Sequence, residues 1–312
     1  MKDQLLWGID LGGTKIEGIV MKTGKNPKII SRLRIPTEKE KGYEHIIRQI
    51  QNLLEQLKND TGKSPSNVGI GIPGTLEPST RTVKNANTTA LIGKTFKDDL
   101  EKKIKLPIRM ANDANCFALA ETKFGAAHKL NPNAEVIFGV IMGTGVGGGL
   151  IANGRIIGGK QGIAGEWGHN FLDESGGKCY CGKTGCVETV ISGPALEKYY
   201  TSLTGTKKSL REINDLYKKG EESSANKTIE HLCHFFGKGI AQVINITDPE
   251  IIVLGGGVGN VESLYTEGVE KVKEHIFNHK LETQFIQPEL GDSAGVIGAA
   301  YLWKEETGQR NE

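Results

Sequence analysis

The sequence lacks any apolar run long enough to cross a bilayer, because none approaches the roughly 20 residues that a membrane-spanning helix needs. It also lacks an excess of charge: 39 Lys and Arg residues balance 37 Asp and Glu residues to a formal net charge of +2. Such an even balance, with the basic residues scattered, predicts neither a nucleic-acid-binding nor a membrane-binding surface. The chain begins with MKDQLLWGID, without a basic and then apolar leader, and Cys116 and Cys233 are expected to be buried thiols. We therefore expect a cytoplasmic protein.

Cysteine is scarce, with five residues in 312, yet three of the five are gathered in the run CYCGKTGC. With a nearby histidine they form one candidate ligand set: His169, Cys179, Cys181 and Cys186. One imidazole and three thiolates fill the four positions of a structural zinc site, and the glycines let a short loop fold around the ion. The alternatives are a redox pair of cysteines and ordinary buried thiols. Glu166 and Glu188 flank the run, so we expect a metal that shapes a pocket between two carboxylates.

Glycine is abundant, at 42 residues, and is concentrated in short clusters after apolar runs. DLGGT at 10–14 joins two predicted strands within Leu5–Met21. MGTGVGG at 142–148 joins two more, EVIFGVIM and LIANGRII. Because the same element occurs twice in a chain long enough for two domains, the sequence predicts two similar α/β lobes with a ligand between them.

Hydrophobic spacing predicts the remaining elements. Further strands are expected at Ile29–Ile35, 68–74, Leu106–Ala111 and 249–256. Helices are expected at Tyr43–Lys58, Ala225–Asn245 and 262–276, and another follows Asn112 and Asp113. The polar segment Thr201–Ser224 is expected to be a surface loop.

Three segments match nucleotide-binding patterns that their context contradicts. GIGIPG at 69–74 and GTGVGG at 143–148 fit G-x-G-x-x-G, but neither opens a helix after the first strand of a βαβ unit. GKCYCGKT at 177–184 fits the P-loop pattern, but no apolar strand precedes it and two of its variable positions are candidate metal ligands. We therefore expect neither a Rossmann domain nor a P-loop.

The glycine turns themselves are candidate phosphate sites. Their potential donors are glycine amides and threonine hydroxyls: Gly12, Gly13, Thr14, Thr144 and Gly145. Lys15 adds positive charge, and Asp10 is a candidate magnesium ligand, directly or through water. The alternative is that each turn is a tight hairpin whose glycines only relieve strain. A third glycine turn at Gly255–Gly257 favours a nucleotide.

Asp113 lies where a predicted strand gives way to a helix, and two roles are open for it. Aspartate caps helix N-termini well. It can also be a general base that takes a proton from a substrate hydroxyl as that oxygen attacks phosphorus, which is typically worth about 10² to 10⁴ in rate. Asn112 beside it can bridge neighbouring hydroxyls. A polyol site built this way would extend to Glu166, His169 and Glu188.

Together these motifs resemble the ROK family of bacterial sugar kinases and repressors. The matching segments are DLGGTK, GIPG, KNANTT, ANDANCFALAE, GTGVGGG, GEWGH, CYCGKTGC-VE and DPEIIVLGGG. The resemblance is nearly full length and implies an actin-like, hexokinase-like ATPase fold of two duplicated βββαβα-type lobes around a central cleft. It places the N-terminal lobe at 1–115 plus 293–312. The C-terminal lobe would be 116–292 and carry the zinc loop 165–193.

The resemblance also implies a role for each matching residue, with Asp113 as the catalytic base in ATP- and Mg²⁺-dependent phosphorylation of a hexose at its 6-hydroxyl. The sugar would be bound by Gly74, Asn87, Asn112, Asp113, Glu166, His169 and Glu188. The nucleotide would lie near Asp10, Gly12, Gly13, Thr14, Lys15, Thr144, Gly145, Gly255, Gly256 and Gly257. The zinc would be structural, held by His169, Cys179, Cys181 and Cys186. The protein would be a homodimer.

Within the kinases, VKNANTT, AGEWGHN and CYCGKTGCVET most resemble bacterial fructokinases that also accept mannose, so D-fructose is the expected substrate. N-acetylglucosamine kinases and glucokinases are the alternatives. Only nine residues separate His169 from Cys179, where fructokinases often carry a longer insertion. A repressor would place a DNA-binding domain before DLGGT, which begins here at residue 10. A non-catalytic sugar sensor would be expected to lose Asp113 or the phosphate glycines.

Overall fold

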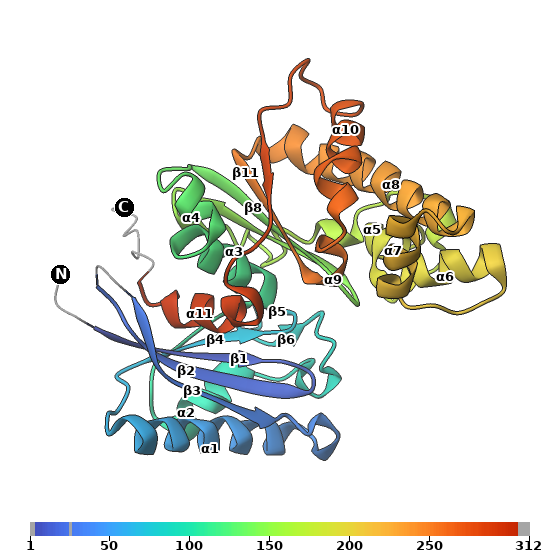
Figure 1. The fold of residues 1–312 in the computed structure, drawn as a ribbon. Helices are drawn as coiled ribbons and strands as arrows, with labels where there is room; N and C mark the ends of the chain where they lie inside the picture. The colour runs from blue at the N-terminus through green and yellow to red at the C-terminus, as the bar shows by residue number, and fades with distance from the viewer. Residues whose placement is uncertain (1–3, 25–26, 305–312) are drawn as a thin grey trace. The chain divides into compact units, whose positions relative to one another are not determined.

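The computed structural model describes residues 4–24 and 27–304 (Figure 1). Its contacts divide the chain into two compact units. The first comprises Met1–Ala120, Gly154–Ala164 and Leu290–Glu312, and the second comprises Glu121–Asn153 and Gly165–Glu289. The predicted boundaries instead put all of 116–292 in one lobe. The described residues form two five-stranded sheets, ordered β3-β2-β1-β4-β7 and β10-β9-β8-β11-β12.

In the first sheet, an antiparallel hairpin and its neighbour are followed by two parallel strands. The strands are β1 (Leu5–Leu11), β2 (Lys15–Lys22), β3 (Lys28–Pro36), β4 (Val68–Ile72) and β7 (Ile108–Asn112). Helix α1 (Tyr43–Thr61) covers one face with its buried apolar stripe. Helix α11 (Ala294–Tyr301) covers the other, so closely that a Cβ on Gly69 would lie 1.8 Å from the carbonyl oxygen of Ala299. Position 69 therefore requires glycine.

Shorter elements complete the first unit and lead out of it. They are the 3-10 turns η1 (Lys39–Lys41) and η2 (Thr89–Leu91), the hairpin β5 (Thr75–Leu76) and β6 (Val83–Lys84), and helices α2 (Phe96–Ile104), α3 (Asp113–Lys123) and α4 (Ala126–Leu130). Helix α3 begins where β7 ends, so the strand places Asn112 and Asp113 at its carboxyl end.

The second sheet repeats the pattern of the first. Its strands are β8 (Val136–Met142), β9 (Val146–Ala152), β10 (Arg155–Ile156), β11 (Ile251–Gly255) and β12 (Gln284–Ile286). Here β8 and β9 form the antiparallel hairpin, while β11 runs parallel to both β8 and β12. Each sheet contains the predicted strand–glycine turn–strand element. The two-lobed fold predicted from the sequence is confirmed.

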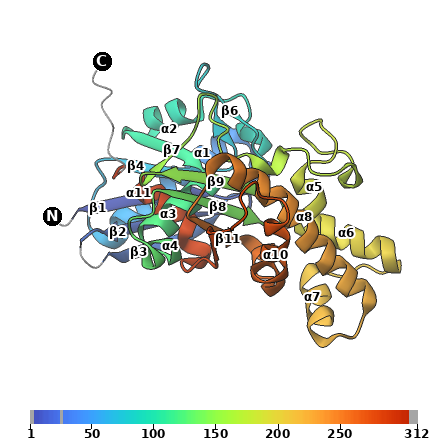
Figure 2. The same cartoon turned by 90° about the horizontal axis from the view of Figure 1, so that it is seen from above.

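Helices fill the rest of the second unit. They are α5 (Val187–Ile191), α6 (Gly193–Thr204), α7 (Leu210–Lys219), α8 (Ser223–Thr247), α9 (Gly256–Gly259) and α10 (Glu267–Lys273). The same unit contains the 3-10 turns η3 (Trp167–His169), η4 (Glu174–Gly176) and η5 (Glu262–Tyr265). A further turn, η6 (Gly291–Ser293), belongs to the first unit. Helices α6, α7 and α8 pack side by side, as both views show (Figures 1 and 2). The core on which α8 packs includes Trp167 and Phe138, together with Phe236 of α8 itself.

Two predicted elements are wrong. The segment Thr201–Ser224 is not a surface loop, because it contains the end of α6 and all of α7, whose capping box joins Ser209 and Glu212. Helix α7 is amphipathic, because Leu210 and Ile213 are buried and Leu216 and Tyr217 pack partly buried on the same side, so a mostly polar composition did not indicate a loop here. The segment 262–276 is not one helix, because the chain leaves helical conformation at Thr266 before α10 begins.

No helix within residues 4–24 and 27–304 has both the length and the apolar character that a membrane span needs.

Candidate functional site

One ligand atom from each of His169, Cys179, Cys181 and Cys186 lies within 4.8 Å of the others. Cys179 Sγ is 3.7 Å from His169 Nδ1, and Cys181 Sγ is 3.6 Å from Cys186 Sγ. Tetrahedral zinc with Zn–S distances of about 2.3 Å separates its sulfur ligands by about 3.7 Å. The predicted donor set therefore converges with the spacing and the chemistry that structural zinc requires.

The loop that carries these thiols is held by its own backbone. Gly182 N–H donates to the carbonyl of Cys179 at 3.0 Å, and Cys179 N–H donates to that of Lys183 at 2.9 Å. Gly182 has a φ of 89°, in the left-handed region where glycine carries no penalty. The tight turn this allows returns the chain from the first two thiols toward Cys186.

Tyr180 lies between two of the thiols and was not predicted as a site residue. Its hydroxyl oxygen is 3.0 Å from His169 Nε2, and the two rings meet edge to face at 5.2 Å. The rest of the Tyr180 side chain is largely exposed. It therefore lies beside one of the predicted sugar ligands, His169. Its position between two metal ligands was the only signal in the sequence.

Glu188 packs onto the second glycine turn. Its Oε2 accepts a hydrogen bond from Val146 N–H at 2.9 Å, and a Cβ on Gly145 would lie 2.5 Å from the same oxygen. The turn is closed by Gly143 N–H donating to the Gly145 carbonyl at 2.9 Å. Thr144, at its tip, is exposed. Glycine at 145 is thus explained within the protein by the approach of Glu188.

The GEWGH segment packs closely against β9. Trp167 is buried and donates from Nε1 to the Gly147 carbonyl at 2.9 Å, and a Cβ on Gly168 would lie 2.0 Å from the Val146 carbonyl oxygen. Trp167 and Gly168 thereby hold η3 against the strand, with Glu166 and His169 at its two ends.

The third glycine turn lies next to the second. Gly256 has a φ of 81°, and a Cβ there would lie 2.2 Å from the Met142 carbonyl oxygen. A Cβ on Gly143 would lie 3.9 Å from the amide nitrogen of Gly257. A Cβ on Gly257 itself would meet nothing within 4 Å. The predicted adenosine turn, Gly255–Gly257, and the predicted phosphate turn are therefore neighbours in the second unit.

In the first unit, Asp10 stands at the end of β1 with its carboxylate between two glycines. A Cβ on Gly71 would lie 3.2 Å from Asp10 Oδ1, and one on Gly295 would lie 3.0 Å from Oδ2. Burial, then the nearby carboxylates of Asp113 and Glu17, raise the pKa of Asp10 to about 7, against a lowering effect of Lys15. Such a carboxylate, with acidic neighbours, fits a hard divalent cation that prefers oxygen ligands.

Of the two roles that the sequence left open for Asp113, helix cap and general base, the cap is taken by Asn112. Asn112 Oδ1 accepts from Ala114 N–H at 2.9 Å, two residues on, so Asn112 occupies the cap position before α3. Its Nδ2 donates to the Gly74 carbonyl at 3.1 Å. Asp113 is the first helical residue and is exposed, and its Oδ1 accepts from the same amide at 2.8 Å.

The first glycine turn differs in one respect from the prediction. Gly12 N–H donates to the Lys15 carbonyl at 3.0 Å and closes the hairpin, so this amide is not free for a phosphate. Thr14 and Lys15 are exposed, and Lys15 Nζ lies 4.0 Å from Asp292. Asn87 is exposed ahead of η2.

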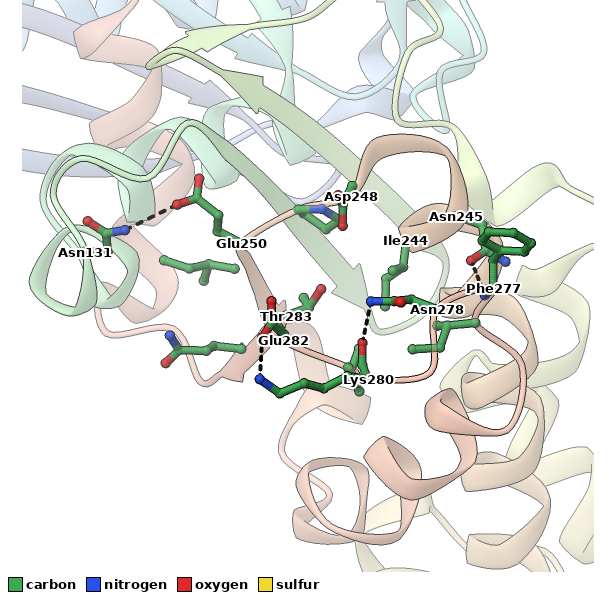
Figure 3. A pocket seen from close by; sticks show the side chains of 15 residues that line it. Asn131, Ile244, Asn245, Asp248, Glu250, Phe277, Asn278, Lys280, Glu282 and Thr283 are labelled. Carbon is green, nitrogen blue, oxygen red and sulfur yellow. Dashed lines mark hydrogen bonds and ion pairs between the residues drawn. The ribbon is translucent and has the colours of Figure 1, made fainter.

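A pocket of about 540 Å³ in the second unit contains none of the predicted site residues (Figure 3). It lies between the end of α8 and β12, and its polar side chains are largely engaged with the protein. Glu250 Oε2 accepts from Val136 N–H at 3.1 Å, and Asn245 Oδ1 accepts from Phe277 N–H at 2.8 Å. These contacts fix the start of β8 and the chain after α10.

Comparison with known proteins gives a family and several relatives. The model of the ROK family matches residues 6–306. The chain is 35% identical to an N-acetyl-D-glucosamine kinase of Yersinia enterocolitica over 96% of this chain and 99% of that one. A ROK hexokinase structure from Thermus thermophilus is 31% identical, with a TM-score of 0.83 over 95% of this chain and 97% of that one. A ROK glucokinase from Streptomyces griseus, in complex with glucose and AMPPNP, is 28% identical, with a TM-score of 0.77 over 96% and 99%.

Proposed function

Because the chain belongs to the ROK family, we propose that it is an ATP-dependent sugar kinase that phosphorylates a hexose at its 6-hydroxyl. Support comes from relatives that are sugar kinases over nearly their full length, one of them in complex with glucose and an ATP analogue. The observation that carries the proposal is the arrangement of Asp10 and Asp113. Asp10 lies near the carboxyl end of β1 and Asp113 directly follows β7, two strands that both pair with β4, and the charge of Asp113 adds to burial in raising the pKa of Asp10.

Asp113 is the proposed general base. Because Asn112 takes the cap position, the Asp113 carboxylate is exposed at the start of α3. It would accept the proton of the sugar hydroxyl as that oxygen bonds to the terminal phosphorus of ATP and the bond from that phosphorus to the bridging oxygen breaks, so that ADP leaves; positioning and electrostatics supply most of the remaining rate. Asn112, Gly74 and Asn87 are proposed to bind the sugar from the first unit, and Asn112 retains one amide hydrogen for this.

Asp10 is the proposed ligand of magnesium, directly or through water. When bound, the ion would neutralise charge on the phosphates of the nucleotide. The exposed Thr14 and Lys15, with Gly12 and Gly13, are proposed to line the phosphates from the first unit. Thr144, Gly145 and Gly255–Gly257 are proposed to line the nucleotide from the second.

Structural zinc is proposed to hold the loop that presents Glu166, His169 and Glu188 to the sugar. With the metal on Nδ1, the other ring nitrogen of His169 carries its hydrogen and is a donor. The Tyr180 hydroxyl oxygen lies 3.0 Å from that nitrogen, so a sugar hydroxyl would take the place of the Tyr180 hydroxyl on the same donor.

Glucose or N-acetylglucosamine is better supported as the substrate than fructose. Of the relatives described above, one is by name an N-acetyl-D-glucosamine kinase, one a glucokinase in complex with glucose and one a hexokinase, and none of them supports the fructose preference expected from the sequence. One or two hydroxyl contacts decide such preferences, so a motif shared by the whole family does not distinguish the sugars.

A coupled assay of ADP release tests the proposal, with magnesium, ATP and one of four sugars: glucose, N-acetylglucosamine, fructose or mannose. We expect turnover with glucose or N-acetylglucosamine. Turnover with fructose alone would keep the chemistry and restore the first substrate prediction. No ADP release with any hexose, from protein that contains zinc, would reject the kinase.

A further inference from the structure

No contact among the described residues requires glycine at position 13. Its φ is outside the left-handed region, and a Cβ there would meet only Lys39 Nζ at 3.7 Å and Thr88 Oγ1 at 4.0 Å, which are ordinary contacts. Gly12 differs, because a Cβ there would lie 2.9 Å from the Lys15 carbonyl oxygen. The missing side chain at Gly13 therefore leaves a space beside the exposed ammonium group of Lys39 that the fold itself does not use, whereas Thr88 is fully buried.

The chain after β3 is pinned to this turn. Thr37 N–H donates to the Thr14 carbonyl at 2.9 Å, and Thr37 Oγ1 donates to the Gly12 carbonyl at 2.7 Å. Thr37 is fully buried. Two hydrogen bonds from one buried residue thus fix the backbone only two positions before Lys39.

Glu38 then reverses the chain in a conformation that glutamate rarely adopts. Its φ and ψ are both 49°, in the left-handed region. Its carboxylate is 2.6 Å from Lys41 Nζ and 2.8 Å from His45 Nε2, and these partners hold the strained residue in place. Strained residues of this kind gather where a fold must aim a functional group. Here the reversal directs Lys39 toward Gly13.

Lys39 also lacks the partner that its neighbours have. Lys41 is paired with Glu38, and Lys15 lies 4.0 Å from Asp292. In the part of the chain that the structure describes, no carboxylate lies within ion-pair distance of Lys39 Nζ. A lysine that faces a space beside a glycine turn, with its charge uncompensated, is suited to an anionic oxygen.

We propose that Lys39 binds the terminal phosphoryl group of the nucleotide in the space above Gly13. This inference rests on the proposed function, because it names a further contact to the phosphoryl group that the kinase would transfer. It adds a residue that the phosphate motifs of the sequence do not contain. The charge of Lys39 would favour both the bound triphosphate and the negative charge that spreads over the phosphoryl oxygens during transfer.

Binding titrations with the non-hydrolysable analogue AMPPNP and magnesium test the proposal, and adenosine serves as a probe without phosphates. Lys39→Met should raise the Kd for AMPPNP by roughly tenfold or more, the size of one charge-assisted contact, and leave the Kd for adenosine unchanged. Lys39→Arg should recover most of the loss. Lys28→Met, which removes an exposed lysine from β3, is the matched control and should change neither Kd.

The outcomes separate the two proposals. If wild-type protein releases ADP with a sugar and Lys39→Met binds AMPPNP as tightly as wild type, the Lys39 contact is wrong and the kinase stands. If no sugar is phosphorylated but AMPPNP affinity depends on Lys39, the contact stands and the sugar reaction is wrong. Equal losses of AMPPNP and adenosine affinity in Lys39→Met would indicate a damaged fold and would also overturn the contact.

Discussion

Asp10 and Glu17 lie directly opposite each other in the β1–β2 hairpin, two acidic residues paired across adjacent strands. Glu17 is buried, and its carboxylate accepts from Arg32 Nε at 2.5 Å and from Arg34 Nε at 2.8 Å. No arginine of β3 donates a hydrogen bond to Asp10 in this way. Burial, together with its acidic neighbours, raises the pKa of Asp10 to about 7. The negative charge of Glu17 is therefore compensated by two arginines, whereas the carboxylate of Asp10 can bind a cation.

This difference predicts a specific pH dependence of stability in protein freed of divalent cations. The pKa of Asp10 is higher in the folded state than the value of about 3.9 expected in the unfolded chain. The folded state therefore holds the extra proton between about pH 4 and pH 7, and the contribution of Asp10 to stability is lost as the pH rises through about 7. Asp10→Asn should be more stable than wild type at pH 8, with a smaller difference at pH 5.5.

Urea unfolding at both pH values, in the presence of a chelator, measures the effect. The same difference in free energy between wild type and Asp10→Asn at pH 5.5 and pH 8 would show that Asp10 titrates normally. Added magnesium should stabilise wild type at pH 8 more than it stabilises Asp10→Asn, because only the native carboxylate offers the cation a charged ligand.

Cys181→Ser should lower zinc content and sugar affinity together. The substitution removes one of four ligands from a closed site, and the loop that carries Tyr180 and leads to Glu188 depends on that site. Metal analysis of purified protein and titration with the preferred sugar measure the two quantities. Cys233→Ser, on the buried face of α8, is a control that keeps all four ligands. Full sugar affinity in zinc-free Cys181→Ser would contradict the structural role of the metal.

Tyr180→Phe should weaken zinc binding without unfolding the protein. With zinc on Nδ1, the phenol oxygen would accept from His169 Nε2, and removal of such an outer partner of a metal-bound histidine typically costs about tenfold or more in metal affinity. Competition with a chromophoric chelator gives the affinity. The ring and its edge-to-face contact remain in phenylalanine, so the change reports the hydroxyl alone. An unchanged zinc affinity would mean that His169 is oriented by its backbone instead.

Local patterns were enough to predict the strands around both glycine turns and the His169–Cys186 block, because alternation of apolar residues and ligand spacing are encoded within short segments. Helix α7 was missed although Leu210, Ile213, Leu216 and Tyr217 have helical spacing, because the mostly polar composition of the segment outweighed that pattern. The hydrogen bond from the Gly12 amide to the Lys15 carbonyl depends on the backbone conformation of the hairpin, which the DLGGT motif alone does not predict. Lys39, Tyr180 and the state of Asp10 depend on tertiary contacts with Gly13, His169 and Glu17.

The central claim is most directly tested by the rate of ADP release with glucose and with N-acetylglucosamine, measured side by side for wild type and Asp113→Asn. We predict turnover by wild type with at least one of these sugars. The variant should lose about 10² to 10⁴ in kcat while it still binds sugar and AMPPNP, because the carboxylate acts on the proton and not on ground-state binding. A variant that keeps wild-type kcat would contradict Asp113 as the base. A wild-type protein that releases no ADP with either sugar, nor with fructose or mannose, would contradict the kinase itself.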